Sequence, residues 1–133
     1  MLWEHNTVVG EGLNSMVSME GGLSGYLADG LTIRDSIFHE GAYGIAGTDT
    51  SLGRPTFDRY APTAIFSSNL IIRTDPDNSI PYGPQPNTIV TRTGFDLVTM
   101  KPVGGPYATT DGKPPGADID GLLQAMPGLD LTN

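Results

Sequence analysis

Short runs of alternating apolar and polar residues mark the N-terminal half of the chain and predict strands rather than helices. The stretch LTIRDSIFHEGAYGIAG, residues 31–47, holds two such runs with polar residues and glycine between them. LWEHNTVVGEG, from Leu2, and AIFSSNLIIRTD, from Ala64, have the same pattern. Three similar stretches indicate a repeat rather than a single hairpin.

The three stretches align on Asn6, Ser36 and Asn69, which stand 30 and 33 residues apart. The aligned positions are Trp3, Ile33 and Phe66, then Thr7, Ile37 and Leu70, then Val8, Phe38 and Ile71, and all of them except Thr7 are apolar. We expect each stretch to lie beside the one before, so that equivalent apolar residues stack in columns. Small polar residues at the bend tolerate left-handed backbone and can hydrogen-bond along their own column.

A second strand follows in the first two units, at 15–19 and at 43–46, each after a turn that contains glycine. The unit lengths require loops that bulge outward, and we expect these at 21–26 and 47–62. The pattern favours a parallel solenoid. An antiparallel sandwich with chance spacing remains the alternative.

The amino-acid composition excludes or disfavours several kinds of structure and several kinds of partner. The 18 glycines and 11 prolines disfavour long helices, and the absence of cysteine excludes disulfides and thiolate metal sites. The net charge of −8 argues against nucleic acid as a partner, because an acidic surface repels phosphate backbones. No apolar run reaches the length of a membrane span, and no signal peptide is visible.

DGLTIRDSIFHEGAYGIAG and DRYAPTAIFSSNLII resemble coils of bacterial right-handed parallel β-helix proteins, the pectate-lyase-like superfamily. PYATTDGKPPGADIDGL, residues 106–122, resembles a C-terminal ending common in that family. The resemblance implies an all-β right-handed parallel β-helix of about three coils with an irregular Pro/Gly-rich tail. It also implies a secreted bacterial protein located outside the cell or on its surface. It implies no activity, because the family includes lyases, hydrolases, epimerases and adhesins.

The expected organisation is one domain, with β-helix coils over 1–74 and an extended tail with a C-terminal capping segment over 75–133. In this arrangement Ile119, Leu122 and Leu123 form a short plug or helix over the last coil. The first coil exposes an open N-terminal face, which we expect to be covered by further coils, a second copy or another protein.

Aromatic and charged residues in the loops are the candidate binding residues. Tyr43, Asp58, Arg59 and Tyr60 lie beside loops rich in glycine or proline and are candidates for contact with a polysaccharide. The alternative is that the rings pack the loops onto the body of the protein. The pairs Arg34–Asp35 and Asp58–Arg59 would suit a lyase of the resembling family, which uses calcium held by acidic residues and an Arg or Lys base. Each pair is more often a solvated surface pair, which is the interpretation that the sequence favours.

Metal sites find little support in the pattern, and no metal site is predicted. The only histidines, His5 and His39, fall in different columns, so a two-histidine site would need help from Glu4 or Glu40. Residues 75–79 fail the EF-hand pattern and predict an acidic turn. Ca²⁺ near Asp111, Asp118 and Asp120 stays as an alternative to a site without a cofactor.

The sequence therefore predicts a non-enzymatic structural or carbohydrate-contacting module, part of a longer secreted protein or of an assembly. The alternative is a fragment of a polysaccharide lyase or hydrolase whose active site lies mostly outside this chain. No Ser-His-Asp set or phosphate-binding loop is evident.

Overall fold

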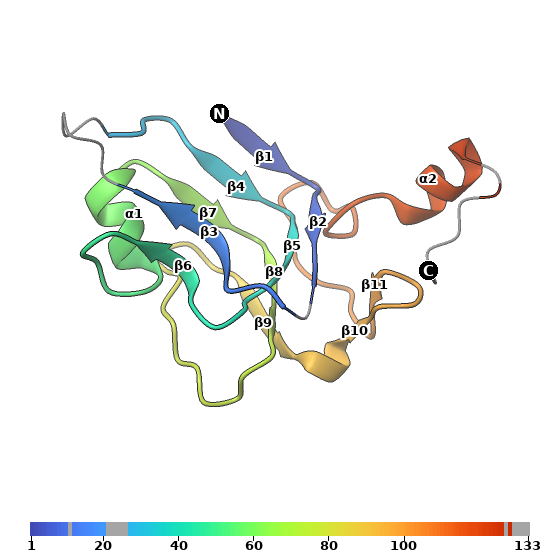
Figure 1. Ribbon diagram of the computed structural model, residues 1–133. Helices are drawn as coiled ribbons and strands as arrows, with labels where there is room; N and C mark the ends of the chain where they lie inside the picture. Colours follow the sequence, from blue (N-terminus) through green and yellow to red (C-terminus); the bar gives the residue numbers. More distant parts are fainter. Residues whose placement is uncertain (11, 21–26, 127, 129–133) are drawn as a thin grey trace.

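The computed structural model of the protein describes residues 1–10, 12–20, 27–126 and 128 (Figure 1). Its strands are β1 (Leu2–Glu4), β2 (Thr7–Val8), β3 (Ser15–Met19), β4 (Thr32–Arg34), β5 (Ile37–His39), β6 (Gly44–Gly47), β7 (Ile65–Ser67), β8 (Leu70–Arg73), β9 (Thr88–Thr91), β10 (Phe95–Asp96) and β11 (Lys101–Pro102). Its helices are α1 (Arg54–Tyr60), a 3₁₀ turn at Arg92–Gly94, and α2 (Ile119–Ala125).

The strands form four small sheets, three parallel and one antiparallel, in the described part of the chain. The parallel sheets have the orders β1-β4-β7, β2-β5-β8-β9 and β3-β6, and β10 pairs antiparallel with β11. From β1 to β8, consecutive strands along the chain belong to different sheets, and strands about 30 residues apart lie side by side (Figure 1). Strand β9 instead pairs with β8, the strand directly before it in the chain.

The predicted alignment of the three stretches is confirmed by the pairing register. Trp3 lies opposite Ile33 and Ile33 opposite Phe66, while Val8, Phe38 and Ile71 form a second column. The strands at 15–19 and 44–47 also pair in parallel, as expected, with one register shift between Ser15 and Val17. Columns of apolar side chains therefore explain the repeat seen in the sequence.

The expected polar column at the bend is present as a ladder of hydrogen bonds. The backbone N–H of Asn6 donates to Ser36 Oγ, that of Ser36 to Asn69 Oδ1, and that of Asn69 to Asn87 Oδ1. The ladder continues to Asn87, one step further than predicted. The left-handed residues precede these positions by one: His5, Asp35 and Ser68 have φ of 50°, 53° and 57°. The expectation that the aligned Asn and Ser residues would be left-handed was therefore wrong by one position.

The predicted all-β right-handed β-helix of about three coils is wrong. The strands form separate short sheets rather than a closed helix, one sheet is antiparallel, and two α-helices are present. The loop expected over 47–62 contains α1, which has Pro55 in its first turn, where the missing N–H costs no helical hydrogen bond. The loop expected at 21–26 lies outside the described residues.

The prediction of an irregular tail is also wrong for part of this region. Residues 88–91 form β9, which extends the second sheet, and residues 95–102 form the β10–β11 hairpin. The C-terminal segment does form a helix, α2, and Ile119 is buried. Leu122 and Leu123 are exposed, so α2 does not act as the expected plug.

The core lies on both faces of the second sheet. On one face Phe38, Phe66, Ile71 and their neighbours form the larger cluster. On the other face Ile37, Leu70 and Ile72 are covered by Phe95. Strand β5 (Ile37–His39) is therefore buried at every position, which explains why its residues do not alternate between apolar and polar.

The N-terminal edge carries apolar residues on strands that have one partner each. Strands β1, β2 and β3 are each the first strand of a parallel sheet, and Met1, Leu2 and Trp3 are exposed beside that edge. None of the helices in the described part of the chain is long and apolar enough to cross a membrane.

Candidate functional site

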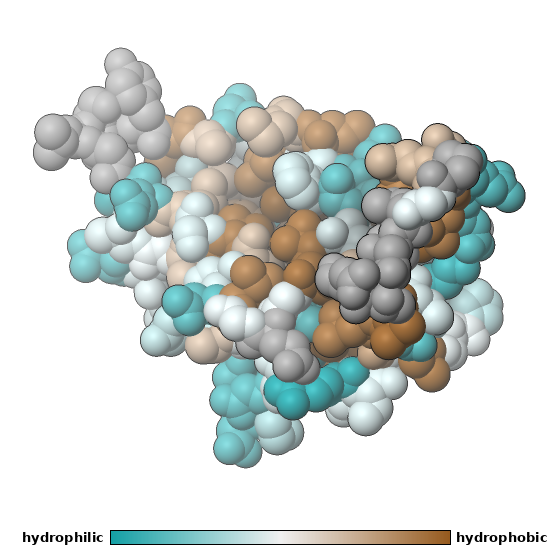
Figure 2. All heavy atoms as spheres, turned by 45° about the vertical axis from the view of Figure 1, so that its right-hand side comes forward, coloured by the Kyte–Doolittle hydropathy of each residue, from teal (hydrophilic) through white to brown (hydrophobic). Residues whose placement is uncertain are grey.

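A pocket of about 810 Å³ opens between the β10–β11 hairpin and the segment that leads into α2. Apolar side chains of Ile37, Met100, Tyr107 and Ile119 line part of it. Its size falls within the range of about 300–1,000 Å³ that is usual for small-molecule sites. On this side of the molecule hydrophobic and hydrophilic surface lie next to each other (Figure 2).

Most of the lysine and histidine side chains of the protein line this pocket. Lys101 and Lys113 are the only lysines of the chain, and both line it together with His5, one of two histidines. Lys101 Nζ lies 2.6 Å from Asp120 Oδ1, whereas the ammonium of Lys113 has no ion pair within 1–10, 12–20, 27–126 and 128. The lining also includes Asp118 and Asp120, so Lys113 is the cation of the pocket that no acidic side chain pairs within the described residues.

The pocket exists because the C-terminal segment packs against β2 and β5. Gly116 donates its N–H to the Asp35 carbonyl, and Ala117 donates its N–H to Thr7 Oγ1. Gly116 has φ of 81°, and a Cβ there would lie 2.5 Å from both Ile37 Cδ1 and Thr7 Oγ1. Only glycine allows this close approach, so Gly116 sets the position of the pocket wall.

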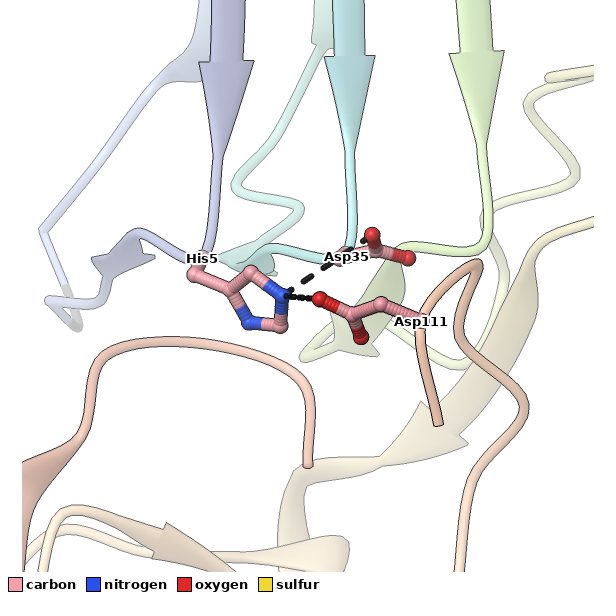
Figure 3. A group of neighbouring side chains, drawn as sticks. All are labelled: His5, Asp35 and Asp111. Atoms are coloured by element: carbon pink, nitrogen blue, oxygen red, sulfur yellow. Dashed lines mark hydrogen bonds and ion pairs between the residues drawn. The ribbon is translucent and has the colours of Figure 1, made fainter. Parts of the chain in front are cut away.

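His5, Asp35 and Asp111 form a compact cluster at the edge of this pocket (Figure 3). His5 Nε2 lies 2.7 Å from Asp111 Oδ2 and 3.9 Å from Asp35 Oδ2. His5 and Asp35 occupy equivalent bends after β1 and β4, and Asp111 comes from the C-terminal segment. The bends bring together His5 and Asp35, which are 30 positions apart. The C-terminal segment adds Asp111, which is 106 positions from His5.

Both carboxylates of this cluster have a further partner that orients them. Thr110 donates both its N–H and its hydroxyl to the buried Asp35 carboxylate. Asp111 Oδ1 accepts the Lys113 N–H, which leaves Oδ2 turned toward His5. The side chains are therefore held in place by the fold rather than free at the surface.

Electrostatics reinforces the contact between His5 and Asp111. Burial alone would lower the pKa of His5, but the hydrogen bond to Asp111 and its negative charge raise that pKa above its usual value. The same hydrogen bond from His5, with that from the Lys113 N–H, lowers the pKa of Asp111. The pair therefore favours a charged imidazole beside a carboxylate in the absence of other ligands.

A second polar cluster surrounds Glu40, whose side chain is fully buried. Arg73 donates two hydrogen bonds to it, of 2.9 and 2.8 Å, and Tyr82 and Asn78 donate one each, of 2.6 and 2.9 Å. Every buried side-chain polar atom in the described residues has a partner. The Glu40 cluster is closed and satisfied, which indicates a structural role.

The structure places the four predicted binding residues outside this pocket. Asp58 pairs with Arg54 at 3.0 Å rather than with Arg59. The Arg59 guanidinium lies over the Tyr60 ring, and Tyr60 is buried. Tyr43 is exposed in the turn before β6, and it is absent from the pocket lining, as are the other three.

The other charged residues considered from the sequence each have contacts within the fold. Arg34 binds Glu4 through two hydrogen bonds of 3.0 and 2.8 Å, which leaves the neighbouring Asp35 to Thr110. Residues 75–78 form the expected acidic turn, closed by the Asp77 N–H on Asp75 Oδ1. His39 is buried and accepts the Gly10 N–H at its Nδ1, as expected for a core histidine.

Two signals in the sequence could have located the site. The alignment already places His5 and Asp35 at the same bend position, and both lysines fall within residues 101–113. The contact of Asp111 with His5 has no sequence signal, because it depends on how the C-terminal segment folds back.

Comparison with protein-family models, with curated proteins and with solved structures found no match for this chain. The resemblance to the pectate-lyase-like superfamily therefore stays a prediction. The function has to be argued from the site itself.

Proposed function

We propose that the chain is a binding module that takes an acidic saccharide in the pocket between the β10–β11 hairpin and the C-terminal segment. The observation that carries this proposal is the meeting of both lysines and His5 with an apolar wall in one pocket of about 810 Å³. A sugar ring presents an apolar face that suits Tyr107 and Met100, and a sugar carboxylate suits an ammonium group.

Lys113 is the group best placed to select the carboxylate. Lys101 is already held by Asp120, so binding an anion there would compete with an existing ion pair. Lys113 carries no such pair in the described part of the chain, and it lines the pocket. The module therefore prefers acidic over neutral saccharides of the same length.

Isothermal titration with trigalacturonate, in the presence of EDTA, tests the proposal. We expect binding that Lys113→Gln weakens about tenfold, since losing a charge-assisted hydrogen bond costs about 1.5 kcal/mol or more. Arg92→Gln is the matched control, because Arg92 is an exposed cation outside this pocket. Equal binding of trigalacturonate and neutral maltotriose, or no binding of either, would refute the proposal.

The second candidate function is assembly, favoured by the apolar edge at β1. A strand edge with free N–H and C=O groups can pair with the same edge of a second copy around a two-fold axis. Trp3 stands at the centre of β1 and is 41% exposed, so it would meet its own copy across such an axis. We propose a second copy as the occupant of this edge.

Light scattering on the purified chain tests the assembly role. We expect a dimer that Trp3→Lys converts into a monomer, because a charge on the edge strand opposes edge-to-edge pairing. Val98→Lys is the control, since Val98 is also an exposed apolar residue, but it lies after the first strand of the β10–β11 hairpin. A wild-type monomer at all concentrations would exclude this role. The enzyme-fragment alternative stays a prediction from the sequence.

A further inference from the structure

His5, Asp35 and Asp111 offer three ligand atoms from three separate segments. These atoms, one imidazole nitrogen and two carboxylate oxygens, all lie within 4.8 Å of one another. We infer that this cluster binds a divalent transition-metal ion such as Zn²⁺. The inference is independent of the saccharide proposal, because it concerns the metal alone.

The distances suit a small ion with little rearrangement. Ligand atoms about 2.0–2.1 Å from a tetrahedral Zn²⁺ lie about 3.3 Å from one another. The separations of 2.7 and 3.9 Å from His5 Nε2 to the two carboxylates lie on either side of that value. Asp111 is exposed on its loop, so it can move by the roughly half an ångström required.

The local charge favours a cation at this point. Asp35, Asp111 and Glu4 bring three carboxylates, and the nearest arginine, Arg34, is already bound to Glu4 by two hydrogen bonds. Asp35 is completely buried, which makes its charge costly unless a cation is close. Arg34 Nε lies 3.9 Å from Asp35 Oδ2 and forms no hydrogen bond with it, whereas a divalent ion between Asp35 and Asp111 would bind both carboxylates directly.

The surroundings are those of a metal site with oriented ligands. Metal ligands are usually held by a second layer of hydrogen bonds, which fixes their direction. Here Thr110 holds Asp35, and the Lys113 N–H holds Asp111. The Thr110 hydroxyl shares Asp35 Oδ2 with the ion, which a carboxylate oxygen with two lone pairs permits.

The donor set selects the class of metal. Ca²⁺ takes six to eight oxygen ligands, which one imidazole and two carboxylates do not supply. One nitrogen and two oxygens suit Zn²⁺ or Co²⁺ and leave a fourth position free. His5 also lines the pocket, so this position faces a cavity that a small ligand can enter.

The test is an NMR titration of the whole chain with Zn²⁺ alone, without saccharide, at about pH 8, where imidazole is largely neutral. We expect the His5 ring signals to change and to saturate at one equivalent. The signals of His39 should stay unchanged, because that ring is buried and bound to Gly10. The two histidines thus provide an internal comparison within one sample.

Variants complete the test. Asp111→Asn keeps an acceptor for the Lys113 N–H but loses the charge, and it should weaken Zn²⁺ binding at least tenfold. His5→Asn, which tolerates the left-handed backbone at this position, should do the same. Asp120→Asn, an exposed carboxylate of the same pocket, should bind like wild type. No change at His5, weak binding of several ions, or wild-type binding by Asp111→Asn would overturn the inference.

Discussion

Replacing Phe66 by alanine is expected to lower the free energy of unfolding by about 3–5 kcal/mol. Phe66 is completely buried at the centre of the larger core cluster. Its ring centroid lies 6.1 Å from that of Phe38, 5.8 Å from that of Phe57 and 5.7 Å from that of Tyr82. The substitution removes buried apolar area and leaves a cavity between β7, α1 and the loop that carries Tyr82.

Urea denaturation of Phe66→Ala measures this loss, and Tyr43→Ala is the control. Tyr43 is half exposed, so its truncation should cost about 0.5 kcal/mol or less. If Phe66→Ala does not fold, Phe66→Leu gives a smaller loss of about 1–2 kcal/mol on the same scale. Equal stability of the Phe66 and Tyr43 variants would mean that these strands do not share the described core.

Replacing Glu40 by glutamine is the second change with a large expected effect, a loss of about 3 kcal/mol. The substitution leaves the Arg73 guanidinium, only 18% exposed, without a carboxylate. Glu4→Gln is a closely matched control, since Glu4 also binds an arginine of the next strand through two hydrogen bonds. Because that pair is exposed, its loss should cost less than about 1 kcal/mol.

The stability of the wild type should also depend on pH through Glu40. Burial alone would raise its pKa, but hydrogen bonds from Arg73, Tyr82 and Asn78 lower it below the usual 4.5. A carboxylate with a lowered folded-state pKa stabilises the fold above about pH 4.5 and loses this contribution as the pH falls through the folded-state pKa. The stability difference between wild type and Glu40→Gln should therefore shrink in acid, and a constant difference would contradict the assignment.

The sequence predicts those parts of the fold in which the same pattern of apolar and polar residues recurs from strand to strand. Trp3, Ile33 and Phe66 could be aligned because each strand carries a large apolar residue at the same distance from a small polar one. Strand β9 pairs with β8, but it carries no fully buried residue, and it follows a proline-rich stretch. It was therefore assigned to the tail.

The parts that the sequence does not predict depend on long-range packing. Phe95 covers Ile37 and Leu70 only because the chain turns back over the second sheet. The same fold-back places Thr110 on Asp35 and Asp111 on His5, contacts that span 75 and 106 residues. Candidate residues chosen by local composition, such as Asp58 and Tyr60, belong instead to α1 and its packing.

We propose that the pocket beside the β10–β11 hairpin binds an acidic saccharide. The most direct test is a backbone amide NMR titration with trigalacturonate in EDTA. We expect the changes to concentrate on residues 100–120 and His5, with the region of Tyr43, Asp58, Arg59 and Tyr60 unaffected. Changes centred on α1 and the turn at Tyr43, or no changes at all, would contradict it.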